Sequence, residues 1–140
     1  MANAEQERML DEWAKAWSDH DTEGLVALFT DDCLYEDVTM GVVNHGKEEL
    51  RSFANQTFVL IPDFKLQLTS RFVGGDWGVI EWVTSGTPTG DVLGMPATGK
   101  SFSSLRAVTV VEFRAGKIHR NSDYWDFATA MRQMGQLPAV

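Results

Sequence analysis

The sequence predicts one α+β domain in which helices pack on the concave face of a cone-shaped, curved antiparallel sheet. Segments with helical periodicity come first, two short strands and a further helix follow, and long strands in a meander complete the chain. Glycine-containing turns join the later strands, which favours antiparallel pairing. A chain of 140 residues is enough for one core and too short for two, so we expect a single domain over residues 1–140.

The first half of the chain is predicted to be mostly helical. Met9, Trp13 and Trp17 are four residues apart and therefore share one face of the first helix. Asp21 suits the N-cap of a second, shorter helix. The predicted elements are helices over residues 6–19, 21–29 and 47–58, a turn over 30–32, and strands over 33–38 and 40–44.

The second half is predicted to consist of strands and a closing helix. The predicted elements are strands over 64–73, 77–87 and 101–114, hairpin turns at 74–76 and 115–116, a final strand that ends near 126, and a helix over 127–134 that ends at Gly135. The loop over 88–100 is rich in Gly, Pro and Thr and long enough to be a functional flap, but it lacks the pattern of a phosphate-binding loop. Apolar residues on both faces of the strand over 77–87 indicate a sheet that is covered on each side.

The final strand carries the most informative pattern, because residues two apart in a strand share a face. His119, Asn121, Asp123 and Trp125 point one way, so a titratable ring, an amide, a carboxylate and an indole lie in a row. This mixture indicates the wall of a partly apolar pocket. The alternative is an edge strand with an ordinary solvated aspartate.

A second carboxylate is expected to face the same pocket. Asp37 lies beside Tyr35 on one face of the strand over 33–38. Arg106 shares a face with Val108 on the strand over 101–114 and is expected to point into the pocket as a hydrogen-bond donor. The side chains expected to line the pocket are Trp13, Trp17, Tyr35, Phe53, Trp82, Arg106, Asn121 and Trp125.

Composition excludes several classes of function. The net charge of −8 and the pI of about 4.7 argue against nucleic acids and anionic membranes as partners. The only cysteine, Cys33, excludes an internal disulfide and a cysteine-based zinc site, and no pair of histidines has the spacing of metal ligands. No apolar run approaches transmembrane length, and the polar N-terminus predicts no signal peptide, so we expect a cytoplasmic protein.

Several of these motifs together resemble the SnoaL-like polyketide cyclases. The resemblance rests on Leu-Val-Ala-Leu-Phe at 25–29, Tyr-Glu-Asp at 35–37, Gly-Lys-Glu-Glu-Leu at 46–50, the glycine-rich loop over 86–100, and Asp-Tyr-Trp-Asp at 123–126. It covers nearly the whole chain and implies the fold of the superfamily named for nuclear transport factor 2, which also holds ketosteroid isomerase and limonene epoxide hydrolase. It also implies pairing of two copies through the outer face of the sheet.

The resemblance implies roles for particular residues. Asp123 matches the acid/base aspartate on the final strand of the cyclases, whereas Asp37 and Trp13 fall where the isomerase has its general base and its oxyanion-hole tyrosine. Pro88 stands where the cyclases have a histidine in the flap. We therefore expect a cofactor-free enzyme that transfers protons on a hydrophobic carbonyl compound, aromatic or polycyclic in kind, through Asp123, Asp37 and His119.

Three alternatives follow from the same residues. The fold could serve a protein that binds a small molecule without catalysis. An epoxide hydrolase would need Asp37, Arg106 and Asp123 around one water molecule. Asp123 could instead accept hydrogen bonds from buried backbone groups or a tyrosine hydroxyl, and Asp126 is expected to cap the last helix.

Overall fold

The computed structural model describes residues 3–138. Its helices are α1 (Asn3–Ser18), α2 (Thr22–Val26), α3 (Gly46–Leu60) and α4 (Phe127–Gln133). Its strands are β1 (Phe29–Asp37), β2 (Val42–His45), β3 (Lys65–Gly74), β4 (Trp77–Gly86), β5 (Phe102–Arg114) and β6 (Lys117–Trp125). Met1, Ala2, Ala139 and Val140 belong to the expected domain but lie outside the described residues, as does the start of the N-terminus from which no signal peptide is expected.

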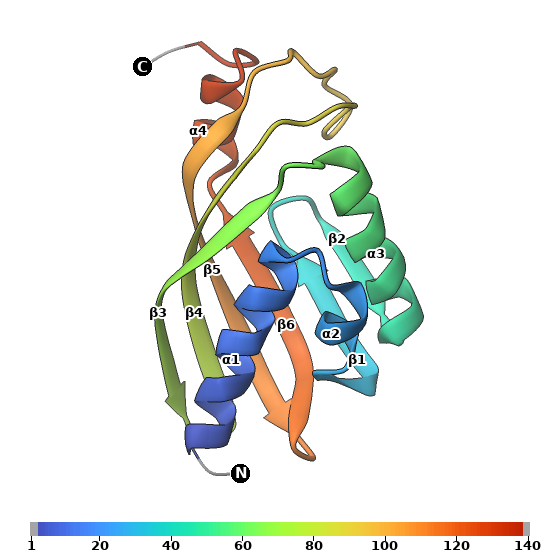
Figure 1. The fold of residues 1–140 in the computed structure, drawn as a ribbon, viewed down its shortest axis with the longest axis vertical. Helices are drawn as coiled ribbons and strands as arrows, with labels where there is room; N and C mark the ends of the chain where they lie inside the picture. Colours follow the sequence, from blue (N-terminus) through green and yellow to red (C-terminus); the bar gives the residue numbers. More distant parts are fainter. Residues whose placement is uncertain (1–2, 139–140) are drawn as a thin grey trace.

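The strands form one six-stranded sheet in the order β2-β1-β6-β5-β4-β3, and α1, α2 and α3 lie on one side of it (Figure 1). The predicted α+β class is therefore confirmed. The sheet is mixed rather than wholly antiparallel, because β1 pairs in parallel with β6, with Tyr35 opposite Asn121 and Asp37 opposite Asp123. This pairing joins the two carboxylates of interest across neighbouring strands.

The boundaries differ from the prediction around β1. The second helix ends at Val26 rather than residue 29, and residues 30–32 belong to β1 rather than to a turn. The chain enters the sheet early because the carbonyl of Leu28 accepts the N–H of Ile118 at 2.9 Å. Residues 38–41 form a tight turn instead of starting β2, and Gly41 supplies a positive φ of 71° there.

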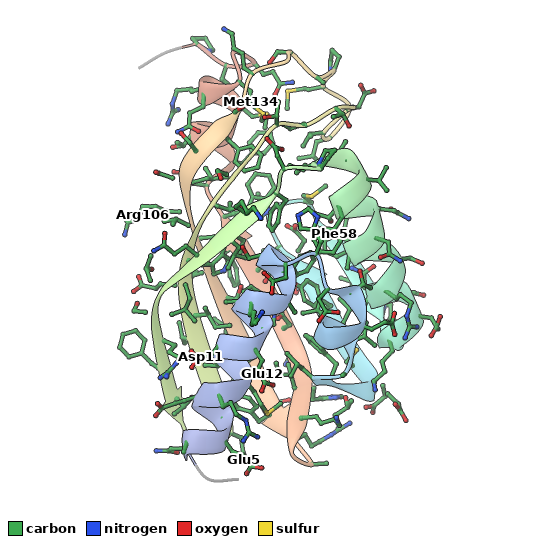
Figure 2. The ribbon with its side chains drawn as sticks, in the orientation of Figure 1. Glu5, Asp11, Glu12, Phe58, Arg106 and Met134 are labelled. Atoms are coloured by element: carbon green, nitrogen blue, oxygen red, sulfur yellow. The ribbon has the colours of Figure 1, made fainter. Side chains whose placement is uncertain are left out.

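The core lies between α1 and the sheet. The face of α1 that carries Met9, Leu10, Trp13 and Trp17 is buried, as the four-residue spacing predicts. A second buried cluster, at the end of the molecule near α4, contains Phe102, Leu105, Ala130, Met131 and Met134 (Figure 2). Asp126 caps α4 by accepting the backbone N–H of Thr129 at 3.1 Å, as predicted.

The outer face of the sheet carries no helix of the described residues, so within one chain the described elements cover only one side. Val79 and Val83 are half-buried there, so part of the apolar pattern of β4 faces outward. Among the described residues, no helix has the length and apolar character needed to cross a membrane.

Candidate functional site

A cavity of about 290 Å³ opens between the concave face of the sheet, α1, α3, α4 and the loop that follows β4. Its wall is mainly apolar, and Pro88 lines it from the loop. Eight of the side chains expected from the sequence line this cavity: Trp13, Trp17, Tyr35, Asp37, Phe53, Trp82, Asp123 and Trp125. Both carboxylates therefore lie where an apolar small molecule would bind.

Asp123 projects from β6 into the cavity and is only 6% exposed. Three side chains donate hydrogen bonds to its carboxylate. The hydroxyl of Tyr35 donates to Oδ2 at 2.6 Å, and the hydroxyl of Thr109 and the amide of Asn121 donate to Oδ1 at 2.7 and 2.8 Å. The sequence-based alternative in which a tyrosine hydroxyl engages Asp123 thus describes its actual contact.

Two tryptophan side chains determine which groups donate and which accept in this hydrogen-bond network. The indole of Trp82 donates to Thr109 Oγ1 at 2.9 Å, and the indole of Trp13 donates to Asn121 Oδ1 at 3.0 Å. An indole N–H can only donate, so the Thr109 hydroxyl and the Asn121 amide must turn their own hydrogens toward Asp123. Oδ1 is consequently held as an acceptor, and a proton on this carboxyl group resides on Oδ2.

Burial raises the pKa of Asp123 to about 7, and the charge of Asp37 adds to the increase. The hydrogen bonds from Tyr35, Thr109 and Asn121 oppose it by stabilising the ionised form. Burial and the neighbouring Asp123 carboxylate also raise the pKa of the Tyr35 hydroxyl well above its usual value. A carboxyl group with a pKa near neutrality can both accept and return a proton.

Asp37 lies on β1, directly across the parallel pair from Asp123. Its Oδ1 accepts the backbone N–H of Met40 at 3.0 Å, and both its oxygens accept the indole N–H of Trp125, at 3.0 and 3.1 Å. Burial raises the pKa of Asp37, against the effect of these donors. Asp37 accepts hydrogen bonds from two N–H groups, one fewer than the three donors of Asp123, so it keeps more unused acceptor capacity.

In the structure, His119 does not line the cavity, contrary to the prediction. The pairing of β6 with β5 shifts between Ile118 and Arg120, so the alternation on which the prediction relied is interrupted. The His119 ring instead lies beside Thr30, with 3.1 Å between Nδ1 and Oγ1. It does not line the cavity, and the expectation of a catalytic His119 is not supported.

Arg106 also lies outside the site. It is exposed on the outer face of β5, and its label in Figure 2 lies at the edge of the molecule. On β5, the alternate residues Leu105, Thr109, Val111 and Phe113 are buried. The shared face of Arg106 and Val108 was predicted correctly, but it is the outer face, and the Asp–Arg–Asp arrangement of an epoxide hydrolase is not formed by Asp37, Arg106 and Asp123.

Asn121 and Thr109 hold the carboxylate of Asp123 in place but do not line the cavity. Both are at most 1% exposed, and neither belongs to the cavity wall. Asn121 had been expected to contact a ligand, whereas it holds Asp123. Thr109 was not predicted as part of the site. Its sequence signal is a lone threonine in the apolar run over 107–111, and only the pairing of β5 with β6 places it opposite Asp123.

One polar group of the cavity wall has no partner. The indole N–H of Trp17 is buried without a hydrogen-bond acceptor among residues 3–138. Within the same described range, no three His, Cys, Asp or Glu side chains are grouped so as to hold a metal ion. The ionisable groups of the cavity wall are the two carboxylates and Tyr35, in an otherwise mainly apolar enclosure.

The profile of the SnoaL-like polyketide cyclases matches residues 7–134, which include every residue of this site. The chain belongs to this family. No match was found among the curated proteins compared. The fold is that of nuclear transport factor 2 and ketosteroid isomerase, as solved structures confirm.

Three solved structures illustrate the similarity of this SnoaL-like chain. A protein with a ketosteroid isomerase-like fold from Catenulispora acidiphila, solved with trimethylamine, is 25% identical, with 93% of each chain covered and a TM-score of 0.80. TsrD from Streptomyces laurentii is 23% identical over 98% of this chain and 99% of its own, with a TM-score of 0.84. A protein of unknown function from Burkholderia pseudomallei is 20% identical over 96% and 98%, with a TM-score of 0.77.

Proposed function

We propose that this SnoaL-like protein is a cofactor-free enzyme that moves protons on a hydrophobic carbonyl compound, as in an aldol-type cyclisation, an isomerisation or a lyase reaction. The observation that carries the proposal is Asp123, a carboxyl group with a pKa of about 7 at an apolar cavity. Such a group can take a proton from a carbon next to a carbonyl group and return it to another atom.

In this proposal, Asp123 Oδ2 is the atom that receives the proton. Oδ1 is held as an acceptor by Thr109 and Asn121, whereas the Tyr35 hydroxyl at Oδ2 can reverse its hydrogen bond when Oδ2 becomes protonated. Tyr35, Thr109 and Asn121 are positioning residues. Asp37 is the second acid/base group.

The second candidate function is binding without catalysis. It is favoured by the three hydrogen bonds to Asp123, which satisfy this carboxylate without any ligand. The two functions differ in one observable quantity, which is the rate of proton transfer to and from a bound ketone.

Deuterium exchange tests the proposal without knowledge of the natural substrate. Bicyclic ketones such as 2-tetralone and 2-indanone are incubated with the protein in D2O, and loss of the α-proton signals is followed by NMR. We expect the wild type to accelerate exchange and Asp123→Asn to lose the acceleration while binding is retained. Glu36→Gln is the matched control, because Glu36 lies on β1 outside the cavity. Ketone binding without accelerated exchange in the wild type would identify a binding protein.

We also propose that two copies of the chain pair through the outer face of the sheet. Val79, Val108, Val110 and Tyr124 give this face an apolar centre, and Tyr124 is 45% exposed. The charged residues beside them are Glu81, Arg106, Glu112 and Arg120. Because two of these residues are acidic and two are basic, the face suits a two-fold interface in which the same patch of each copy contacts that of the other.

Light scattering after size-exclusion chromatography tests the pairing. Tyr124→Lys should shift the protein from the mass of a dimer to 15.6 kDa. Val59→Lys is the control, because Val59 is 76% exposed on α3, away from this face. A wild type with the mass of a monomer would contradict the proposal.

A further inference from the structure

The charged groups of the cavity all have one sign. Its wall contains the carboxylates of Asp37 and Asp123, and none of the described residues that line it is Lys, Arg or His. Neither carboxylate forms an ion pair among residues 3–138. Buried carboxylates in proteins are usually paired with a cation or a metal ion, so the site lacks a countercharge that a ligand could supply.

The rest of the wall suits a positive charge as well. Eight aromatic side chains line the cavity: Trp13, Trp17, Tyr35, Phe53, Phe64, Trp82, Phe102 and Trp125. Aromatic rings attract an ammonium group through their electron-rich faces, and the attraction grows when water is excluded. The same wall has no cationic group to receive a carboxylate or phosphate, so it disfavours anions.

We propose that the cavity is specific for a hydrophobic ligand that carries a protonated or quaternary amine, with Asp37 as its counter-ion. Asp37 is the better partner because it has two hydrogen-bond donors, whereas Asp123 has three. The inference rests on the proposed function and changes one role in it, because Asp37 becomes the counter-ion instead of the second acid/base group. Asp37 holds the ammonium group of a carbonyl compound, and Asp123 remains free to exchange the proton.

Three probes of nearly equal size and different charge test the proposal. They are phenyltrimethylammonium, its neutral isostere tert-butylbenzene, and the anion 2-methyl-2-phenylpropanoate. Four of the five tryptophans line the cavity, so binding is followed by tryptophan fluorescence. At pH 8 and physiological salt, we expect the cation to bind at least about tenfold more tightly than the neutral isostere, and the anion to bind most weakly.

Variants separate a specific contact from attraction by the net charge of −8. Asp37→Asn should reduce the preference for the cation to about twofold or less while the neutral isostere still binds, whereas Glu36→Gln removes the same charge and should retain the preference. Equal or tighter binding of tert-butylbenzene by the wild type, or a preference that survives in Asp37→Asn, would overturn the inference.

The outcome can be read separately from that of the exchange experiment. A strong preference for the cation without accelerated deuterium exchange supports the proposed ligand class and contradicts the proposed acid/base function. Accelerated exchange of neutral ketones without any preference for the cation supports the proposed acid/base function and contradicts the proposed ligand class.

Discussion

The hydroxyl of Tyr35 donates a hydrogen bond of 2.6 Å to Oδ2 of Asp123, between two strands that run in parallel. Tyr35 pairs in register with Asn121, so its side chain reaches two residues along β6 to the carboxylate. The bond lies on the oxygen that is free to titrate, because Oδ1 is held by Thr109 and Asn121. Asp123 is therefore the group through which substitutions at Asp123, Tyr35 and Thr109 are expected to act.

Asp123→Asn should remove a pH dependence of stability. The pKa of Asp123 is about 7 in the folded protein, against an ordinary value of 3.8. The folded state therefore binds this proton more tightly, so the group stabilises the fold below about pH 4, and this contribution is lost as the pH rises to about 7. Relative to Asp123→Asn, the free energy of unfolding of the wild type should fall by on the order of a few kcal/mol across this range.

Urea denaturation at a series of pH values measures this difference. Carboxylates with lowered pKa values, such as Asp32 and Asp126, are present in both proteins and cancel in the comparison. Parallel stability curves for the two proteins would mean that Asp123 titrates normally, and the case for acid/base chemistry would lose its basis.

Tyr35→Phe should raise the pKa of Asp123 further. The tyrosine hydroxyl stabilises the ionised carboxylate, so its removal favours the protonated form. The measurement is the carbon-13 chemical shift of the aspartate carboxyl groups as a function of pH, with Asp123→Asn used to assign the signal. If exchange of ketone protons is catalysed, its pH profile should move upward with the same pKa. An unchanged or lower pKa would contradict the direction of the Tyr35 hydrogen bond.

Thr109→Val should destabilise the protein by about 1–3 kcal/mol, because the indole of Trp82 loses its acceptor and Asp123 loses a donor. The loss should be larger at pH 8 than at pH 5, since the missing donor stabilised the ionised form of Asp123. Thr109→Ser is the matched control, because it keeps the hydroxyl and loses only a methyl group; its cost should not vary with pH. Equal pH dependence in the two variants would show that packing alone explains the effect.

Arg106→Ala should leave the site unchanged. Arg106 is exposed on the outer face of the sheet, so its removal should alter the free energy of unfolding of the monomer by no more than about 0.5 kcal/mol. The affinity for phenyltrimethylammonium and any exchange activity should equal those of the wild type. A loss of ligand affinity in the monomeric form of this variant would revive the sequence-based expectation that Arg106 contacts the ligand.

Much of the site could be predicted from the sequence because period-two alternation holds through long stretches of its strands. Tyr35 and Asp37 share the inner face of β1, and Asp123 and Trp125 share the inner face of β6, as their spacing indicates. The same reasoning failed for His119, because a local shift in register displaces one residue without leaving a mark in the sequence. It failed for Arg106 because alternation groups residues by face but does not say which face is covered.

By itself, the sequence determined the class of the fold, the buried face of α1 and the two carboxylates with the aromatic residues around them, since these follow from the order and periodicity of nearby residues. The tertiary structure decided which groups meet. The parallel pairing of β1 with β6 and the placement of Thr109 opposite Asp123 join residues that are far apart in the chain. The raised pKa of Asp123 depends on burial by all of these elements together, and no local pattern contains that information.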